Sequence, residues 1–332
     1  MTQARKEQIN YAETTTYHIV SKCARHTWLS GYDPDTGRCY EYRRFQLVAR
    51  VHYFTSAFFI DLLEYDVLHN HYHLILDAMT EQAKRASRQE VVERYYAVSN
   101  AEGYKEVKRW YYGKSLSQED YDKAMNDIEF FRERLQCISW LMQKINQPFA
   151  VQINAEEGMQ RSSFWEGRFY SRGIYNLVQL LVCMVYVALN SFRAGLASKP
   201  EASQYTGFYE RFNRRLTHSQ TLVDYGLPEF KSNRLKRYNI PVKPLKPFTG
   251  YESGNDQWGI AFTLEDYSQL IDATARAKHA DKQEAQLDAN VQPILERLGK
   301  DKLDWVESVE ALDAINYLRS LQTQSKAVPS SV

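Results

Sequence analysis

The sequence predicts an α+β fold, with helices packed on a mixed or antiparallel sheet. Glycine and proline are few, 14 and 9 of 332 residues, which favours helices over a turn-rich all-β fold. Along residues 14–200, short segments with strand patterns alternate with longer segments whose apolar residues recur at helical spacing.

The expected elements begin with a strand and a helix. Residues 17–21 (YHIVS) alternate in character and include β-branched side chains, which is typical of a strand. Most of 43–63 carries apolar residues at helical spacing, so we expect a helix there. Residues 64–68 and 71–77 are then predicted to be strands joined by a tight turn at His69–Asn70.

The next region is mainly helical. Residues 80–147 are charged and rich in glutamine, with room for two or three helices, the last over 127–146. Residues 154–163 have loop chemistry, and 164–174 alternate as a strand would. This order is similar to a ferredoxin-like βαββαβ unit whose second helix is expanded by an insertion at about 80–160.

The helix that follows has signals at both ends. Asn176 is the expected N-cap, with Gln179 three residues later in the capping-box position. An apolar run over 177–189 forms the body, and Gly195 stands where a C′ glycine would.

Composition changes beyond about residue 200. Residues 205–250 are rich in Tyr, Arg, Lys and Pro, 263–322 have helical patterns, and the polar tail 323–332 is expected to be disordered. We therefore expect a catalytic-type domain over 1–205 and a basic, helical region without an assigned role over 206–332.

Charge and cysteine usage bound the function. A net charge of +1 gives no overall basic field, although a local basic patch is compatible with a neutral total. Four cysteines without a CxxC pair suit neither a disulfide framework nor a structural zinc site. The N-terminal sequence has no apolar leader, and the apolar run 177–189 is too short for a bilayer. We expect a cytoplasmic location and no membrane partner.

The first candidate site residues are His71 and His73. Residues two apart on a strand share a face, so the two imidazoles would form a ready-made pair of metal ligands, while Tyr72 points into the opposite layer. The alternative is that these are surface or core histidines. A single histidine is usually structural, which is our expectation for His18 and His52, but a His-x-His pair directly before an apolar strand favours a metal site.

The second candidate group is Tyr186, Asn190 and Arg193. Spacings of four and seven residues place them on one helical stripe. Burying three polar groups costs free energy unless something satisfies them. The alternative is a core tyrosine with its hydroxyl hydrogen-bonded and an asparagine near the helix end.

The two groups together suggest a reaction centre. Two imidazoles and the Asn190 oxygen give three ligands with open positions, which suits Mg²⁺ or Mn²⁺ bound to substrate phosphate. Such an ion polarises the phosphate, Tyr186 attacks as the nucleophile, and Arg193 or the metal helps the phenol to ionise.

Several motifs resemble those of the HUH endonuclease superfamily. His71-Tyr72-His73 before an apolar strand is similar to the family's His-hydrophobic-His motif. The segments 165–169 (WEGRF) and 186–195 (YVALNSFRAG) resemble the tryptophan-x-glycine-arginine-phenylalanine element and the tyrosine-helix run of insertion-sequence single-tyrosine transposases and REP-associated tyrosine transposases. The likeness covers about residues 14–200.

This resemblance implies roles for individual residues. Tyr186 would be the nucleophile, and His71, His73 and Asn190 would be the metal ligands. The implied function is cleavage and rejoining of single-stranded or hairpin DNA through a 5′-phosphotyrosine, as in transposition. Relatives act as homodimers or as single chains, so the oligomeric state stays open.

Three departures affect local geometry and length. His69 stands where the family usually has proline, Ser191 replaces the proline after the helix asparagine, and the chain is about twice as long as compact members. The roles of the 80–160 insertion and of the C-terminal region therefore do not follow from the resemblance.

Further DNA contacts are expected from Trp165 and Arg168, with Phe169, because aromatic rings and arginines hold single strands. The alternative for Trp165 and Phe169 is a place in the core. A basic run is either a DNA-backbone contact or a solvated charged face. It comprises Arg211, Arg214, Arg215, Lys231, Arg234, Lys236 and Arg237.

Two other functions were weighed. One is a domesticated, non-catalytic DNA-hairpin-binding protein, against which the retention of every proposed catalytic residue argues. The other is an unrelated metal hydrolase of the amidohydrolase-barrel type. That class needs more ligands downstream, where only His218 and His279 follow, and no repeating βα pattern is present.

Overall fold

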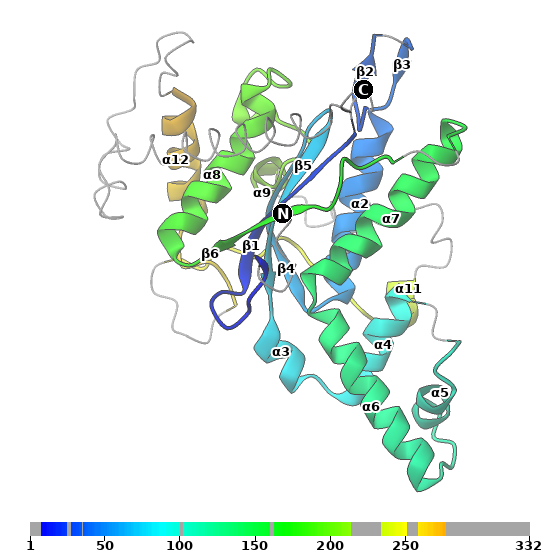
Figure 1. The fold of residues 1–332 in the computed structure, drawn as a ribbon. Helices are drawn as coiled ribbons and strands as arrows, with labels where there is room; N and C mark the ends of the chain where they lie inside the picture. The colour runs from blue at the N-terminus through cyan, green and yellow to red at the C-terminus, as the bar shows by residue number, and fades with distance from the viewer. Residues whose placement is uncertain are drawn as a thin grey trace, which may run out of the picture. The chain divides into compact units, whose positions relative to one another are not determined.

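The structure is a computed structural model, shown in Figure 1. It describes residues 8–24, 28–34, 36–99, 102–159, 163–213, 234–250 and 258–276. Within these ranges, no helix is long and apolar enough to cross a membrane.

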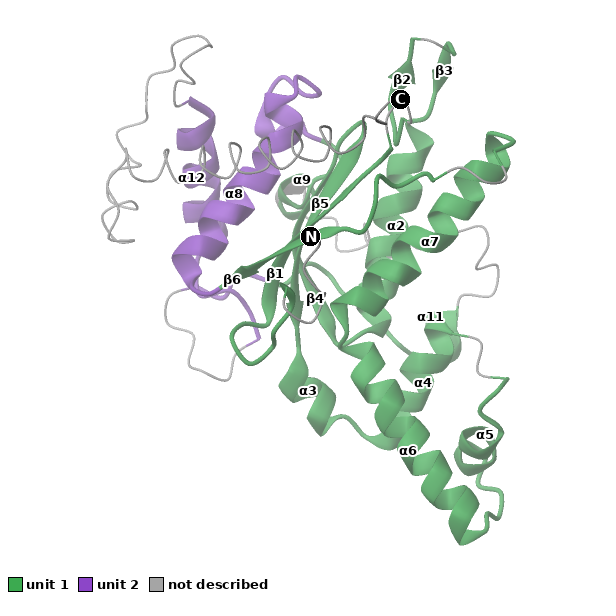
Figure 2. Ribbon diagram, in the orientation of Figure 1, with its two compact units in different colours: residues 1–174, 204–246 green, residues 175–203, 247–332 purple. Residues whose placement is uncertain are grey.

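The chain divides into two compact units, coloured separately in Figure 2. Unit 1 consists of residues 1–174 and 204–246, and unit 2 of residues 175–203 and 247–332.

A four-stranded sheet organises unit 1. Its strands are β1 (Thr16–Lys22), β4 (Ile60–Val67), β5 (His71–Ala78) and β6 (Tyr170–Ile174), in the order β4-β5-β1-β6. All three neighbouring pairs are antiparallel. A separate two-stranded sheet joins β2 (Tyr32–Asp33) and β3 (Arg38–Cys39). With the helices below, this confirms the α+β class.

The helices of unit 1 are α2 (Tyr42–Ala57), α3 (Thr80–Arg85), α4 (Arg88–Val98), α5 (Lys105–Tyr111), α6 (Gln118–Leu135), α7 (Ile138–Glu156), α9 (Gly207–Asn213) and α11 (Arg234–Arg237). Unit 2 contains α8 (Leu177–Arg193), the short 3-10 helix η1 (Pro200–Ala202) and α12 (Leu264–Arg276). In unit 1, α2 and α7 run side by side (Figure 1). In unit 2, α8 packs with α12.

The strand at 17–21 and the tight turn at His69–Asn70 are confirmed, but the predicted helix 43–63 is too long. It ends at Ala57, because Phe58 is extended (φ −79°, ψ 159°), and β4 begins at Ile60. All eight residues of β4 are buried. These buried residues include Asp61, Glu64 and Asp66, so the strand lacks a strict alternation of apolar and polar residues, and its start could not be separated from the helix before it.

The helices of the insertion also differ from the prediction. The expected helix 127–146 is wrong, because α6 ends at Leu135 and α7 begins at Ile138. Two serine N-caps divide the rest, Ser87 accepting from the Glu90 N–H and Ser117 from the Asp120 N–H.

Two boundaries near residue 160 differ as well. Helix α7 continues to Glu156, so the start of the expected loop 154–163 is helical. The strand expected over 164–174 is formed only from Tyr170.

The two faces of the sheet differ in character. One face contributes apolar side chains to the core, among them Tyr17, Ile19, Tyr72, Leu74 and Leu76. The opposite face carries polar groups, among them His18, Asp66, His71, His73 and Asp77. Imidazoles on β5 therefore face away from the main core of unit 1.

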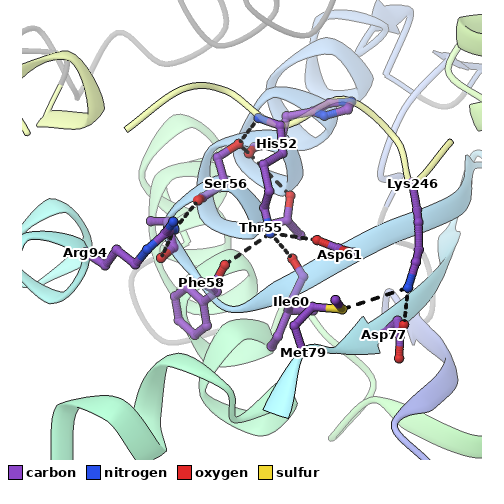
Figure 3. Close-up of polar contacts among 12 residues, drawn as sticks. His52, Thr55, Ser56, Phe58, Ile60, Asp61, Asp77, Met79, Arg94 and Lys246 are labelled. Carbon is purple, nitrogen blue, oxygen red and sulfur yellow. Dashed lines mark hydrogen bonds and ion pairs between the residues drawn. The ribbon is translucent and has the colours of Figure 1, made fainter. Parts of the chain in front are cut away.

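A late segment, residues 240–246, returns to the sheet and is held by two lysines. The Lys243 ammonium donates to the carbonyl oxygens of Phe58 (3.2 Å) and Ile60 (2.9 Å) and lies 2.9 Å from the Asp61 carboxylate. Lys246 lies 2.5 Å from the Asp77 carboxylate. Figure 3 shows these contacts around Asp61 and Lys246.

Candidate functional site

The two predicted metal-ligating histidines occupy one face of β5. Their ring centroids are 4.9 Å apart and their planes are inclined by 74°. His73 is buried and His71 is partly exposed. Between them, Tyr72 points to the core, where its hydroxyl donates to the Asn146 side chain of α7 (2.5 Å). This contact fixes the strand from the opposite face, as the alternation predicted.

Each imidazole has a polar neighbour at its Nδ1 atom. His73 Nδ1 lies 2.9 Å from Nε2 of His18 on β1, and the two rings are stacked with planes 15° apart. His71 Nδ1 lies 2.7 Å from the side-chain oxygen of Asn70 in the preceding turn. Such contacts fix the tautomer and orientation of a ring, which is what partners of metal-ligating histidines do.

Desolvation and nearby cationic groups lower the pKa of both imidazoles and so favour their neutral forms. Desolvation, helped by the nearby Lys22 ammonium, lowers the pKa of His71 to about 4. Desolvation, with the neighbouring His71 and His18 rings, lowers the pKa of His73 well below its usual value. A neutral imidazole is the form that binds a metal ion.

The segment with the tryptophan lies beside the end of β1. Glu166 N–H donates to the Lys22 carbonyl (2.9 Å), and the two side chains form an ion pair at 3.3 Å. The Trp165 indole donates to the Asn146 carbonyl (3.0 Å) and its ring lies against Tyr72, so the ring is largely a packing group. Arg168 is exposed.

The other predicted residues lie on α8 in unit 2. Asn176 caps this helix as expected, accepting from the Gln179 N–H (2.9 Å), and Gly195 has the positive φ (+72°) of a C′ glycine. Tyr186 is only 3% exposed. Asn190 is partly buried, and its Nδ2 atom is buried without a hydrogen-bond partner among the described residues.

The last turn of α8 carries Arg193, which is partly buried. The imidazoles belong to unit 1, and Tyr186, Asn190 and Arg193 belong to unit 2. Their assembly into one centre stays a prediction.

The described members of the predicted basic run differ in exposure. Arg211 is nearly buried, donates to the Leu63 carbonyl and lies 4.0 Å from the Glu64 carboxylate, so it serves the packing of α9. Lys236 and Arg237 are exposed, and Arg234 is partly exposed. The remaining three, Arg214, Arg215 and Lys231, lie outside the described residues.

Two neighbours of the imidazoles were not predicted from the sequence. His18, expected to be structural, contacts His73. Lys22 is paired in register with His71. His18 and Lys22 lie on the same face of β1 as Val20, which is paired with His73. Their closeness to the imidazoles could be predicted only from the pairing of β1 with β5. His52 is structural as expected, lying 2.9 Å from Glu210 in the interior.

Among the described residues, no group of three or more His, Cys, Asp or Glu side chains could hold a metal ion. The donor set to consider is therefore the two imidazoles with an amide. In unit 2, the Asn190 amide has a buried Nδ2 atom without a partner among the described residues, and the oxygen and nitrogen of an amide exchange on a flip, so its joining the imidazoles stays a prediction.

The chain resembles a solved structure but matches no family model and no curated protein. Among solved structures, the chain is similar to a REP-associated tyrosine transposase bound to a REP hairpin. The identity is 12%, the alignment covers 65% of this chain and 88% of that chain, and the TM-score is 0.37.

Proposed function

We propose that this protein is a metal-dependent endonuclease and strand transferase for single-stranded or hairpin DNA, of the transposase type. The observation that carries the proposal is the pair His71 and His73. The two rings share a face, are neutral, and have Nδ1 neighbours that orient them. This arrangement suits metal ligation and is more than a chance pair of core histidines would need.

The fold of unit 1 supports a ferredoxin-like HUH domain. Along the sequence, the elements follow as β1, α2, β4, β5, the helical insertion and β6. Within the sheet, the strands lie in the order β4-β5-β1-β6. This is the succession of a βαββαβ unit with an expanded second helix.

The reaction assigned to the chain is a transesterification. The Tyr186 phenol loses its proton and its oxygen attacks a DNA phosphate, forming a 5′-phosphotyrosine, while the bond to the neighbouring sugar breaks and leaves a 3′-hydroxyl. The phosphoester bond is conserved and can be transferred to another strand.

The cofactor proposed for this reaction is a divalent ion, Mg²⁺ or Mn²⁺, which His71, His73 and Asn190 would hold. When bound, it supplies Lewis-acid polarisation of the phosphate. Arg193 and the exposed Arg168 are assigned to the DNA backbone, which guanidinium groups bind well.

A direct test uses labelled hairpin DNA, Mn²⁺ or EDTA, and denaturing gels. Wild-type protein is expected to form a covalent adduct only with metal, and Tyr186→Phe is expected to form none while still binding DNA. Tyr175→Phe, in an exposed tyrosine just before α8, is the matched control and should retain the adduct. An adduct with Tyr186→Phe would show that another residue is the nucleophile.

A non-catalytic DNA-hairpin-binding protein is the second candidate. The observation that favours it is the burial of Tyr186, which is 3% exposed, because a nucleophile has to reach its substrate. In that case hairpin DNA binds with equal affinity to wild type and Tyr186→Phe, and no adduct forms with any metal.

A further inference from the structure

A pocket within unit 1 lies away from the histidines, among α4, α5 and α11. Its volume is about 240 Å³. It is lined by Tyr96, Ser99, Glu102, Lys108, Tyr112, Arg234, Arg237 and Tyr238. Segments about 130 residues apart in the sequence therefore contribute to one surface.

Three cations meet in this pocket. Lys108, Arg234 and Arg237 form no ion pair with any described residue, and one carboxylate, Glu102, lines the same space. Other basic residues of the C-terminal segment are engaged, Lys243 with Asp61 and Lys246 with Asp77. Within the described part of the chain, the pocket therefore has three cations to one carboxylate, an excess of positive charge that would suit an anionic ligand.

Three tyrosines provide flat apolar surface beside these charges. The Tyr112 ring is 57% exposed. Tyr96 and Tyr238 have ring centroids 6.3 Å apart. The Tyr96 hydroxyl oxygen is buried and has no hydrogen-bond partner among the described residues. A ligand that stacks on a ring and also accepts or donates a hydrogen bond would match these groups.

We propose that this pocket binds one nucleotide of a single-stranded DNA segment, with its base on the tyrosines and its phosphates on Lys108, Arg234 and Arg237. Rings next to cations are the combination that holds single strands, because every base has a face for stacking and every linkage has a phosphate. A duplex covers its base faces, and a pocket of this size has no room for one.

This inference goes beyond the proposed reaction. Binding here involves neither the imidazoles nor Tyr186, so it should occur in EDTA and without any adduct. The helical insertion would then hold the single-stranded DNA at a point away from the imidazoles of β5.

The test measures anisotropy of labelled oligothymidylate with the full-length protein in EDTA over a range of salt. Tyr112→Ala is expected to weaken binding about tenfold and Tyr112→Phe to restore it, because stacking needs the ring and not the hydroxyl. Lys108→Gln with Arg237→Gln should make the log–log salt dependence shallower by about 1.4, since each phosphate contact contributes about 0.7 on single strands.

Matched controls lie on the same unit outside the pocket. Tyr121→Ala removes another exposed tyrosine, and Arg85→Gln removes another exposed arginine; both should bind as wild type. The Tyr186 adduct assay, run separately, reports on the proposed reaction and not on this pocket.

Two outcomes would overturn the proposal. One is wild-type affinity and salt dependence in the pocket variants. The other is competition by thymidine monophosphate as strong as that by the unlabelled oligonucleotide, which would assign the pocket to a free nucleotide. Circular dichroism of each variant checks that a loss of binding is not a loss of fold.

Discussion

At the scale of single residues, the orientation of the imidazoles depends on their neighbours on adjacent elements. His73 Nδ1 faces His18 Nε2 at 2.9 Å across the β1–β5 pair. A neutral imidazole donates from one ring nitrogen and accepts at the other. If His73 Nδ1 donates to His18 Nε2, the Nε2 lone pair of His73 is left for a metal; if His18 donates instead, Nε2 of His73 carries the hydrogen and has no lone pair to offer.

His18→Ala is expected to weaken Mn²⁺ binding by roughly 10- to 100-fold, the usual effect of losing a group that orients a ligand. Isothermal titration measures the affinity. Because His18 acts through His73, His18→Asn should recover part of it by offering a hydrogen bond to the same atom. His69→Ala, in the nearby turn, is the matched control and should bind Mn²⁺ as wild type. Unchanged affinity in His18→Ala would remove His18 from the site.

At the scale of elements, local signals were predicted well and non-local ones were not. Helix α8 begins after Asn176 and ends before Gly195, as expected, because capping depends on residues within one turn. The break between α6 and α7 escaped prediction. Cys137 there adopts an extended conformation (φ −86°, ψ 108°) within a sequence without Gly or Pro.

The candidate site follows the same division. The face shared by His71 and His73 follows from the period of a strand, so it could be predicted from three residues. The contact of His18 with His73 spans 55 positions. It depends on which strands pair and in which register. The sequence does not determine this, because β1 and β5 are not joined by a short turn that would fix their pairing.

Asn176→Ala is expected to lower the free energy of unfolding of unit 2 by about 1 kcal/mol, because the Gln179 N–H loses its cap. Thermal or urea unfolding followed by circular dichroism measures the change. Asn176→Ser should restore most of the stability, since serine is also a good N-cap. Equal stability of the alanine variant would mean that water or another group caps α8 as well.

At the scale of the whole molecule, the chain leaves and re-enters unit 1. Residues 204–246 return to it after α8, and 247 onwards belongs to unit 2. Lys243 contacts Asp61, which is 182 positions earlier in the sequence, and Lys246 contacts Asp77, which is 169 positions earlier. These two lysines lie beyond the basic run considered for DNA contacts, and they tie the returning segment to β4 and β5 (Figure 3).

Asp61→Asn is expected to destabilise unit 1 by about 2 kcal/mol, because the partly buried Lys243 ammonium loses its carboxylate partner and keeps only its two carbonyl acceptors. Burial already lowers the pKa of Lys243, and the Asp61 carboxylate opposes that shift. In Asp61→Asn/Lys243→Met the charge is absent, so the double variant should be more stable than Asp61→Asn alone. Asp122→Asn, on the exposed face of α6, is the control and should stay within about 0.5 kcal/mol of wild type. Urea unfolding of wild type, Asp61→Asn, Lys243→Met and the double variant gives the four values of the cycle. Strict additivity of the two substitutions would show that the pair contributes nothing to holding residues 240–246.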